Sequence, residues 1–372
     1  MKNGNNTHAF FALLRAGLWE QDVQHSEYGN IDFNTVYQIA AGQSVVGLVA
    51  AGIERVADEK APKDVVLNVV GDTLQLEQKN GAMNAFVGML TKRLQEKSVD
   101  FVLVKGQGVA QCYERPLWRA CGDVDLLLDE KNYHKAKDCL CGYATTIDRE
   151  EQGRLHLAMT INDWTVELHG TLRGNMLGRI DKGIDRIQDD VFSDKKFRIW
   201  RNDDTEVLLP APTEDSLFIF THILHHFTQG GIGLRQVCDW CRLLWKYKGE
   251  IDNSYLEKRL GEMQLMSEWK VFGTMTVEYL GMPEEAMPFY SPDSRWNKKA
   301  ERLMSFILKT GNMGANRDLS YYDRHSYVVS KLMSLKWHTT DAIEQFAIFP
   351  MDSVKIWGRM LVNGLKRIMN HQ

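Results

Sequence analysis

The hydrophobic residues of this 372-residue chain change their spacing twice, and these two changes limit the folds that it can adopt. Up to about residue 98 they recur three or four positions apart, which is the spacing of a helix face. From Phe101 to Leu209 they come in short β-branched or alternating runs, and after Pro210 the helical spacing returns. We therefore predict an α+β fold: a helical region at residues 1–98, a small mixed-sheet domain at residues 99–210, and a helical domain at residues 211–372.

Short apolar runs mark the expected strands of the central region. The runs at residues 101–104 and 123–128 are each followed by a short helical segment. Asn162 and Asp163 separate two further runs, as the residues of a two-residue hairpin turn do. The expected strands are Phe101–Val104, Asp123–Leu128, Leu155–Ile161, Trp164–Leu168, Phe197–Trp200 and Glu206–Leu209.

Helical spacing dominates both ends of the chain. The segment Asp64–Gln95 is long, and Gly71 and Gly81 are expected to interrupt it. Its expected buried side consists of Leu67, Val70, Leu74, Phe86, Met89, Leu90 and Leu94. After a helix that begins near Thr213, further helices are expected at Leu234–Tyr247, Tyr255–Leu260, Trp269–Leu280, Lys298–Lys309 and Lys355–Met369.

The most informative local motif is Gly122-Asp123-Val124-Asp125, which three leucines follow. Residues two apart in a strand point to the same face of a sheet, so Asp123 and Asp125 are expected to project together. Two adjacent carboxylates repel each other unless a positive charge lies between them, and Mg²⁺ prefers oxygen ligands. The motif therefore predicts a metal site.

Glu167 and His169 have the same spacing at the end of the expected hairpin. If this hairpin lies beside the strand of Asp125, Glu167 completes a set of three carboxylates. Their charge of about −3 matches two Mg²⁺ ions together with the phosphates of a nucleotide. Two ions roughly 3.5–4 Å apart stabilise the attacking and leaving oxygens of an in-line displacement, which is the chemistry of nucleotidyl transfer.

A glycine-containing turn, Lys105-Gly106-Gln107-Gly108, follows the first strand and opens a helix. Glycine lets the backbone approach an anion closely, and a helix N-terminus adds amide donors and a favourable dipole. Arg119, four residues before Asp123, adds a guanidinium that can reach the same phosphates. The segment is therefore predicted to bind phosphate groups.

Together these motifs resemble the polymerase-β-like nucleotidyltransferase superfamily, which has a strand, a glycine turn, a helix, an arginine before Asp-x-Asp, and a third acid on a later strand. The segment Leu103–Gly106, with Tyr113, Arg119 and Gly122–Leu127, is most similar to a bacterial group described as uncharacterised nucleotidyltransferases. The later Glu167-Leu168-His169 and the histidine-rich helix that precedes Arg235 and Asp239 share this resemblance, which covers roughly residues 100–245.

The resemblance implies an enzyme that moves a nucleoside monophosphate from a nucleoside triphosphate, such as ATP, to an unidentified acceptor hydroxyl or phosphate and releases pyrophosphate. It gives Asp123, Asp125 and Glu167 the catalytic and metal-binding roles, with two Mg²⁺ ions that Mn²⁺ can replace. Residues expected to bind the nucleotide phosphates are Lys105, Gly106, Gln107, Gly108, Arg119 and His169. The family turn usually reads Gly-Gly or Gly-Ser, whereas Gln107 follows Gly106 here.

Several of these residues also have a structural interpretation. Lys105 can be a lysine at a strand end whose ammonium reaches water. Arg119 can pair with a nearby carboxylate such as Glu114, and His169 can be a half-buried histidine held by hydrogen bonds. For Asp125, we expect that the substitution Asp125→Asn abolishes turnover and leaves the thermal midpoint unchanged or higher, because it relieves repulsion between carboxylates.

The later helix carries a histidine cluster in which His222 and His226 are four residues apart, a spacing that also occurs in metal sites. No glutamate directly follows His222, so this helix lacks the metalloprotease pattern. We expect this helix to pack against the sheet domain with one of His222, His225 and His226 facing the nucleotide. Cys238 and Cys241 are expected to be buried helix residues rather than a redox or zinc site.

Charge and composition exclude several classes of protein. The 45 lysines and arginines and the 49 aspartates and glutamates give a net charge of −4, so a non-specific nucleic-acid binder is not expected. The longest apolar run, Val45–Ile53, is far shorter than the roughly 20 residues that span a bilayer. With a polar N-terminus and reduced cysteines as the default, we expect a cytoplasmic protein that binds a nucleoside triphosphate and a small-molecule or protein acceptor.

A second hypothesis is that the chain has the same fold but does not catalyse the reaction. The chain is then a nucleotide- or protein-binding module, for example one half of a toxin–antitoxin pair, and Gln107 in the glycine turn favours this interpretation slightly. The sequence indicates neither the acceptor nor the preferred base.

Overall fold

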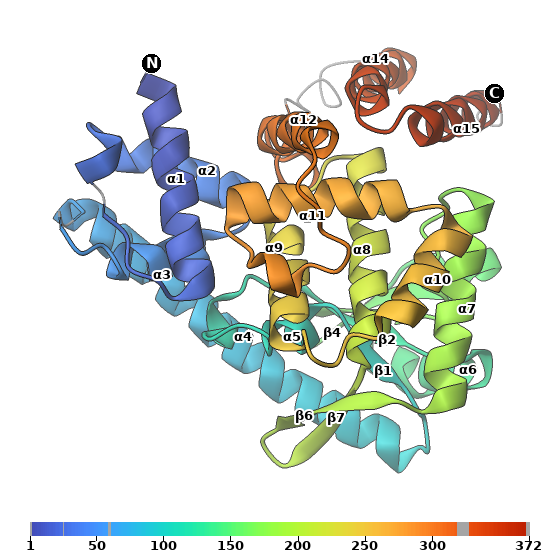
Figure 1. Cartoon of the computed structure of the whole chain (residues 1–372). Helices are drawn as coiled ribbons and strands as arrows, with labels where there is room; N and C mark the ends of the chain where they lie inside the picture. Colours follow the sequence, from blue (N-terminus) through green and yellow to red (C-terminus); the bar gives the residue numbers. More distant parts are fainter. Residues whose placement is uncertain (1, 25, 59–60, 318–326, 370–372) are drawn as a thin grey trace.

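The computed structural model describes residues 2–24, 26–58, 61–317 and 327–369. Helices surround two β-sheets (Figure 1). The strands are β1 (Val102–Val104), β2 (Asp123–Leu127), β3 (Thr146–Ile147), β4 (His156–Ile161), β5 (Trp164–His169), β6 (Phe197–Asn202) and β7 (Thr205–Pro210). The helices are α1 (Lys2–Trp19), α2 (Phe33–Gly42), α3 (Val46–Glu54), α4 (Lys63–Glu96), α5 (Gly106–Ala110), α6 (Glu130–Leu140), α7 (Gly178–Asp194), α8 (Pro212–Gln229), α9 (Leu234–Lys246), α10 (Asn253–Met263), α11 (Met266–Leu280), α12 (Ser294–Thr310), α14 (Tyr327–Phe346) and α15 (Pro350–Met369).

The larger sheet has the strand order β1-β2-β5-β4-β3, in which β2 and β5 run parallel and the other neighbours run antiparallel. The predicted mixed sheet with helical flanks is therefore present. The expected hairpin is also present as β4 and β5, and both turn residues, Asn162 and Asp163, have positive φ. The strands β6 and β7 form a separate hairpin, as expected from the runs at residues 197–200 and 206–209.

The two faces of the larger sheet have opposite character. One face carries Val124, Leu126, Val166 and Leu168, which are buried in one apolar cluster with side chains of α4 and α6. Burying each such side chain contributes about 1.5–3 kcal/mol to folding. Because side chains alternate along a strand, the polar residues of β2 and β5 point to the other face, toward α8 and α9.

Helix α4 is one uninterrupted helix of 34 residues, so the expected breaks at Gly71 and Gly81 are wrong. A Cβ at either glycine would meet nothing within 4 Å, which places both on an open side of the helix. Glycine at such positions costs about 1 kcal/mol in helix stability but does not end the helix.

The buried side predicted for α4 is correct only in its C-terminal half. Leu67 and Leu74 are exposed, at 71% and 52% of their surface, whereas Phe86 and Leu90 are buried. The reason is a change of partner along the helix. Its first half contacts α3 through other positions, such as Val65, and its second half covers the apolar face of the sheet.

The N-terminal and C-terminal helices share one apolar core. Side chains of α1 to α3 belong to the same buried cluster as those of α8 to α12. Helices α1 and α3 cross so closely that a Cβ at Gly17 would lie 1.8 Å from the carbonyl oxygen of Leu48, which excludes every other residue type there. The boundaries predicted at residues 98 and 210 stay a prediction.

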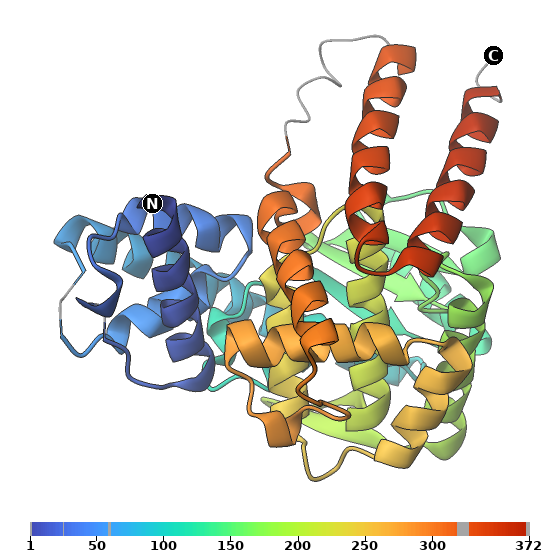
Figure 2. The same ribbon diagram turned by 45° about the horizontal axis from the view of Figure 1, so that its top comes forward.

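The C-terminal part agrees with the helical pattern of the sequence. The predicted helices correspond to α9 to α12 and α15, and Cys238 and Cys241 are fully buried in α9, as predicted. Helices α14 and α15 lie side by side and extend away from the other helices (Figure 2). Within the described ranges, no helix combines the length and the apolar character that crossing a bilayer requires.

Candidate active site

The pairing of β2 with β5 brings the predicted acidic residues to one face of the sheet. Asp125 lies beside Glu167 in the parallel register, and Asp123 lies beside Thr165 two pairs earlier. His169 links the two strands, because its Nε2 is 2.8 Å from Asp125 Oδ1 and 3.3 Å from Glu167 Oε2. The expectation that the hairpin lies beside the strand of Asp125 is therefore confirmed.

These side chains line a cavity of about 310 Å³. Its acidic residues are Asp123, Asp125, Glu167 and Asp239. Cationic and imidazole side chains line the same cavity, from Lys105, Arg154, Arg173 and Arg235 and from His156, His222, His225 and His226. All three histidines of α8 reach the cavity, whereas the sequence had suggested one.

Lys105 lies in an unusual backbone conformation at the start of the glycine turn. Its φ of 57° and ψ of −147° belong to a region that only glycine adopts readily, and such a conformation costs on the order of 1–3 kcal/mol. Gly106 continues the turn with a φ of 42°. The ammonium of Lys105 lies 2.9 Å from Asp125 Oδ1 rather than in water, so the turn delivers a positive charge to the acidic side chains.

The three carboxylates differ in their electrostatic surroundings. Burial would raise the pKa of Asp125, but the Lys105 ammonium and a hydrogen bond from His169 lower it below its usual value. Burial and the neighbouring Asp125 raise the pKa of Asp123. Hydrogen bonds from His156 and then His169 hold the pKa of Glu167 well below its usual range. Lys105 and Arg235 offset only part of this rise in pKa, so Asp123 is the least compensated of the three carboxylates.

Repulsion between carboxylates was expected at Asp125. Instead it raises the pKa of Asp123. Burial also opposes the charge on Lys105, yet Asp125, Glu167 and Asp123 together raise its pKa. The sequence-based expectation that Asp125→Asn leaves the thermal midpoint unchanged or higher no longer follows, because the buried Asp125 carboxylate accepts hydrogen bonds from Lys105 and His169.

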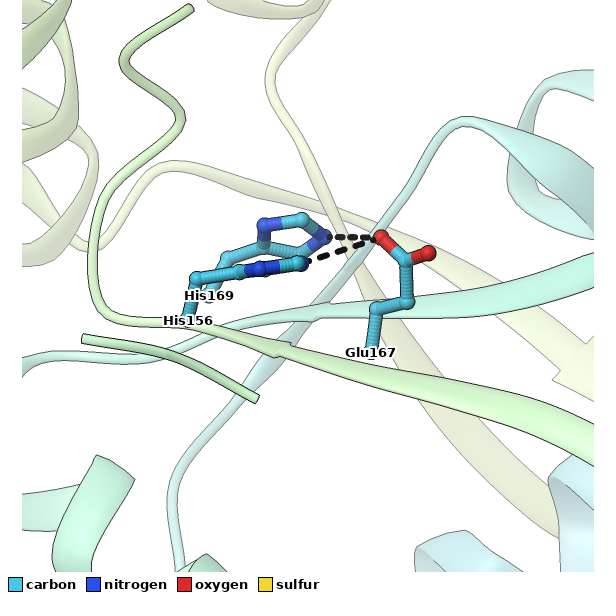
Figure 3. Close-up of side chains that lie close together, drawn as sticks. All are labelled: His156, Glu167 and His169. Carbon is cyan, nitrogen blue, oxygen red and sulfur yellow. Dashed lines mark hydrogen bonds and ion pairs between the residues drawn. The ribbon is translucent and has the colours of Figure 1, made fainter. Parts of the chain in front are cut away.

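Two histidines converge on one oxygen of Glu167 (Figure 3). The Nε2 atoms of His156 and His169 each lie 3.3 Å from Glu167 Oε2, and the two imidazole rings are 4.9 Å apart. Burial opposes a charge on His169, but its hydrogen bonds with Asp125 and Glu167 raise its pKa. The other ring nitrogen of His169, Nδ1, is buried and has no hydrogen-bond partner among the described residues.

The remaining residues of the glycine turn point away from the cavity. The amide of Gln107 is buried and donates to Asn80 Oδ1 at 3.0 Å, and Asn80 in turn donates to the carbonyl oxygen of Arg119. A Cβ at Gly108 would lie 2.8 Å from Leu209 of β7, so this glycine allows close packing with the hairpin. Of the turn, Lys105 and Gly106 line the cavity.

Arg119 forms a buried network with α9. Its Nε and Nη2 atoms donate to the two oxygens of Asp239 at 3.0 and 2.6 Å, and the Tyr113 hydroxyl donates to the same carboxylate at 2.8 Å. Glu114, considered as a partner from the sequence, instead pairs with Arg242. Arg119 lines the cavity, but its Nε and Nη2 atoms both donate to Asp239.

The helix α8 contributes neutral histidines. Burial lowers the pKa of His225 and of His226 to about 4, and it lowers that of His222 well below the usual value. Arg235 of α9 lies beside them, where burial lowers its pKa, and its Nε has no hydrogen-bond partner among the described residues. Its Nη1 donates to the carbonyl oxygen of Ala120 at 2.9 Å.

The comparisons with known proteins bear on this geometry. A family model described as an uncharacterised nucleotidyltransferase matches residues 29–281, which is more than half of the chain. The chain belongs to this nucleotidyltransferase family. The match extends from α2 through α11 and includes every residue that lines the cavity except Met313. Neither the curated proteins nor the solved structures give a match.

Membership of the nucleotidyltransferase family supports nucleotidyl transfer as the general reaction and a nucleotide as the substrate class. It agrees with the resemblance found at residues 100–245 and extends it in both directions.

Sequence reasoning missed several side chains of this nucleotidyltransferase cavity. The position of His156 could have been predicted, because the two-residue turn at Asn162-Asp163 fixes the hairpin register and places His156 opposite His169. Arg235 entered the sequence analysis only as part of the resemblance, without a role. For Arg154 and Arg173, which lie just outside the two hairpin strands, the sequence held no comparable signal.

Proposed function

We propose that the protein is a metal-dependent nucleotidyltransferase that moves a nucleoside monophosphate from a nucleoside triphosphate to an acceptor hydroxyl or phosphate and releases pyrophosphate. The observation that carries this proposal is the position of Asp123, Asp125 and Glu167 on neighbouring parallel strands that line one cavity with cationic side chains. Family membership supplies the reaction class.

The charge of the three carboxylates fits a divalent cation. Asp123, Asp125 and Glu167 carry about three negative charges when ionised, of which the Lys105 ammonium, in contact with Asp125, offsets one. The raised pKa of Asp123 is consistent with this shortage of positive charge. The oxygen donors of Asp123, Asp125 and Glu167 suit Mg²⁺ or Mn²⁺, and such an ion supplies Lewis-acid stabilisation of charge on the reacting phosphoryl group when it is bound.

The cationic side chains of the cavity are the proposed binding groups for the triphosphate. Arg235 is the strongest of these groups, since no ion pair ties it to a carboxylate in the described part of the chain and its Nε is unpartnered. Lys105 exchanges its contact with Asp125 for a phosphate oxygen. Arg119, held by Asp239, positions the loop before β2 instead. Charges fixed in place before the reaction are the main source of rate enhancement in such sites.

Glu167 has a narrower role than the sequence suggested. A pKa well below the usual range keeps its carboxylate ionised, but it also makes Glu167 a weak base. We therefore propose that Glu167 orients the acceptor and a cation rather than removing the acceptor proton alone. His156, which is half-buried and hydrogen-bonded to Glu167, gives that proton a path to solvent.

The proposal is tested with nucleoside triphosphates labelled at the α-phosphate, incubated with the purified chain and a cell extract. We expect a labelled product and pyrophosphate that both disappear when a chelator is added. The Asp125→Asn variant is the matched control and should form neither. A product that forms equally with that variant, or with chelator present, contradicts the proposal.

One observation favours a second function. The Lys105 ammonium already neutralises part of Asp125, as expected of a nucleotidyltransferase fold that has lost its metal and serves as a binding module. Thermal shift measurements separate the two functions. Stabilisation by a nucleoside triphosphate only when Mg²⁺ or Mn²⁺ is present supports the enzyme, and stabilisation by nucleotide without metal supports the binding module.

A further inference from the structure

The cavity contains a second set of possible metal ligands that differs chemically from the three carboxylates. Among the described residues, His156, Glu167 and His169 form the group of three whose ligand atoms lie within 4.8 Å of one another. Figure 3 shows both imidazoles directed at the same carboxylate oxygen. Two of the three donors are nitrogens, whereas Mg²⁺ sites in proteins consist of oxygen ligands.

The separations of these atoms match those of ligands around one ion. Ligands 2.0–2.2 Å from a tetrahedral ion such as Zn²⁺ lie about 3.4 Å from each other. The Nε2 atoms of His156 and His169 are each 3.3 Å from Glu167 Oε2.

The three donors are held by regular strands. His156 and His169 are direct partners across the antiparallel pair of β4 and β5, and Glu167 precedes His169 by two residues on the same face. His169 is buried, whereas His156 and Glu167 are partly exposed to the cavity. The geometry is therefore fixed by the sheet on one side and open to an entering ion on the other.

From these donors we infer that His156, Glu167 and His169 form a site for one divalent transition-metal ion, of the class of Zn²⁺, Mn²⁺ or Co²⁺. Imidazole ligands favour such ions over Mg²⁺. The inference depends on the proposed function only for the role of the ion in the reaction, since binding follows from the donor set alone. Two cation sites would then adjoin Glu167. The site with His156 and His169 selects a transition metal, while the oxygens of Asp123 and Asp125 remain suited to Mg²⁺.

The test uses the full chain after treatment with a chelator. Co²⁺ is titrated in the presence of excess Mg²⁺ while its visible absorption is recorded, and Zn²⁺ binding is measured by calorimetry. We expect one Co²⁺ per chain, with an absorption spectrum of nitrogen and oxygen coordination that excess Mg²⁺ does not remove. His156→Asn should weaken Co²⁺ binding at least about tenfold. His222→Asn, which changes a histidine of α8 in the same cavity, should leave binding unchanged.

Two results overturn the inference: a wild-type chain that shows no Co²⁺ or Zn²⁺ binding under Mg²⁺, or a His156→Asn variant that binds as tightly as the wild type. If His156→Asn fails to fold by circular dichroism, the wild-type titration and His156→Gln decide. The outcome is separable from that of the proposed function. Tight Co²⁺ binding without any nucleotidyl product contradicts only the reaction, and a product formed with Mg²⁺ alone by a chain that binds no Co²⁺ contradicts only this site.

Discussion

Two charge clusters that line the cavity show how similar residues can have different roles. The first, which we call the Arg119 cluster, contains Arg119, Asp239 and Tyr113. The second, the Asp125 cluster, contains Asp123, Asp125 and Glu167 with Lys105 and His169. In the Arg119 cluster one cation meets one anion through two parallel hydrogen bonds, and each side chain is only 6% exposed.

The Asp125 cluster lacks this balance. Its three carboxylates face a single ammonium, and Asp123 has a raised pKa because of burial and its neighbour Asp125. A matched buried pair holds a fold together, and the loss of one partner is costly because the other charge stays buried. An unmatched cluster that lines a cavity is suited to bind an additional cation. The difference in charge balance therefore separates a structural cluster from a functional one.

The largest expected effect is on catalysis, through Asp125→Asn. We expect turnover to fall at least about 1,000-fold, because the variant removes a charge that orients the cation and the phosphates. Asp163→Asn, in the hairpin turn, is the control and should keep the wild-type rate. Asp125→Asn should also lose about 1–3 kcal/mol of stability, because Lys105 and His169 lose their charged acceptor. Near wild-type turnover in Asp125→Asn would exclude a catalytic Asp125 cluster.

The next effect is on stability, through Arg119→Met. This change leaves Asp239 buried without its cation and should lower the free energy of unfolding by about 3–5 kcal/mol, measured by urea denaturation. Arg115→Met is the matched control, because Arg115 pairs with Glu20 and Glu54 near the surface. It should cost no more than about 1 kcal/mol. Equal losses in the free energy of unfolding for the two variants would show that the Arg119 cluster does not stabilise the fold more than a surface ion pair does.

A smaller effect concerns the backbone of Lys105. Lys105→Ala and Lys105→Gly both remove the ammonium, but only glycine relieves the unfavourable conformation at φ 57°. We expect the glycine variant to be more stable than the alanine variant by about 1–2 kcal/mol. The comparison is made by thermal and urea unfolding. If alanine is the more stable of the two, the turn does not hold Lys105 under strain.

The smallest expected effect is on the stability of Asp123→Asn. Because burial and Asp125 raise the pKa of Asp123, its charged form opposes folding at neutral pH. Asp123 is exposed and solvent screens its charge, so neutralising it should leave the free energy of unfolding unchanged or slightly higher, while turnover is lost. A marked loss of stability would mean that Asp123 is as well paired as Asp239.

The sequence predicted the parts of the site that depend on local patterns. Alternation along β2 and β5 placed Asp123, Asp125 and Glu167 on one face, and a two-residue turn defined the hairpin. These rules act over a few residues, so they can be applied without coordinates. The register of that hairpin also places His156 opposite His169, so the position of His156 could have been predicted.

Contacts between distant segments could not be predicted in this way. Asp239 reaches Arg119 across 120 residues, and nothing in the local sequence of either residue indicates the other. The ammonium of Lys105 turns toward Asp125 because of a backbone conformation that a lysine rarely adopts. Likewise, α4 changes its buried side where its packing partner changes, although the apolar spacing continues. In each case tertiary packing outweighs the local pattern.

The central claim, that the Asp125 cluster binds a divalent cation beneath a triphosphate, is tested most directly by calorimetric titration of the four nucleoside triphosphates. The titrations are made with Mg²⁺ or Mn²⁺, with a chelator, and with Asp125→Asn. We predict that at least one nucleotide binds to the wild-type chain with metal, and that its affinity falls at least about tenfold with the chelator and in the variant. Equal affinity in all three conditions, or no nucleotide bound in any of them, would contradict the claim.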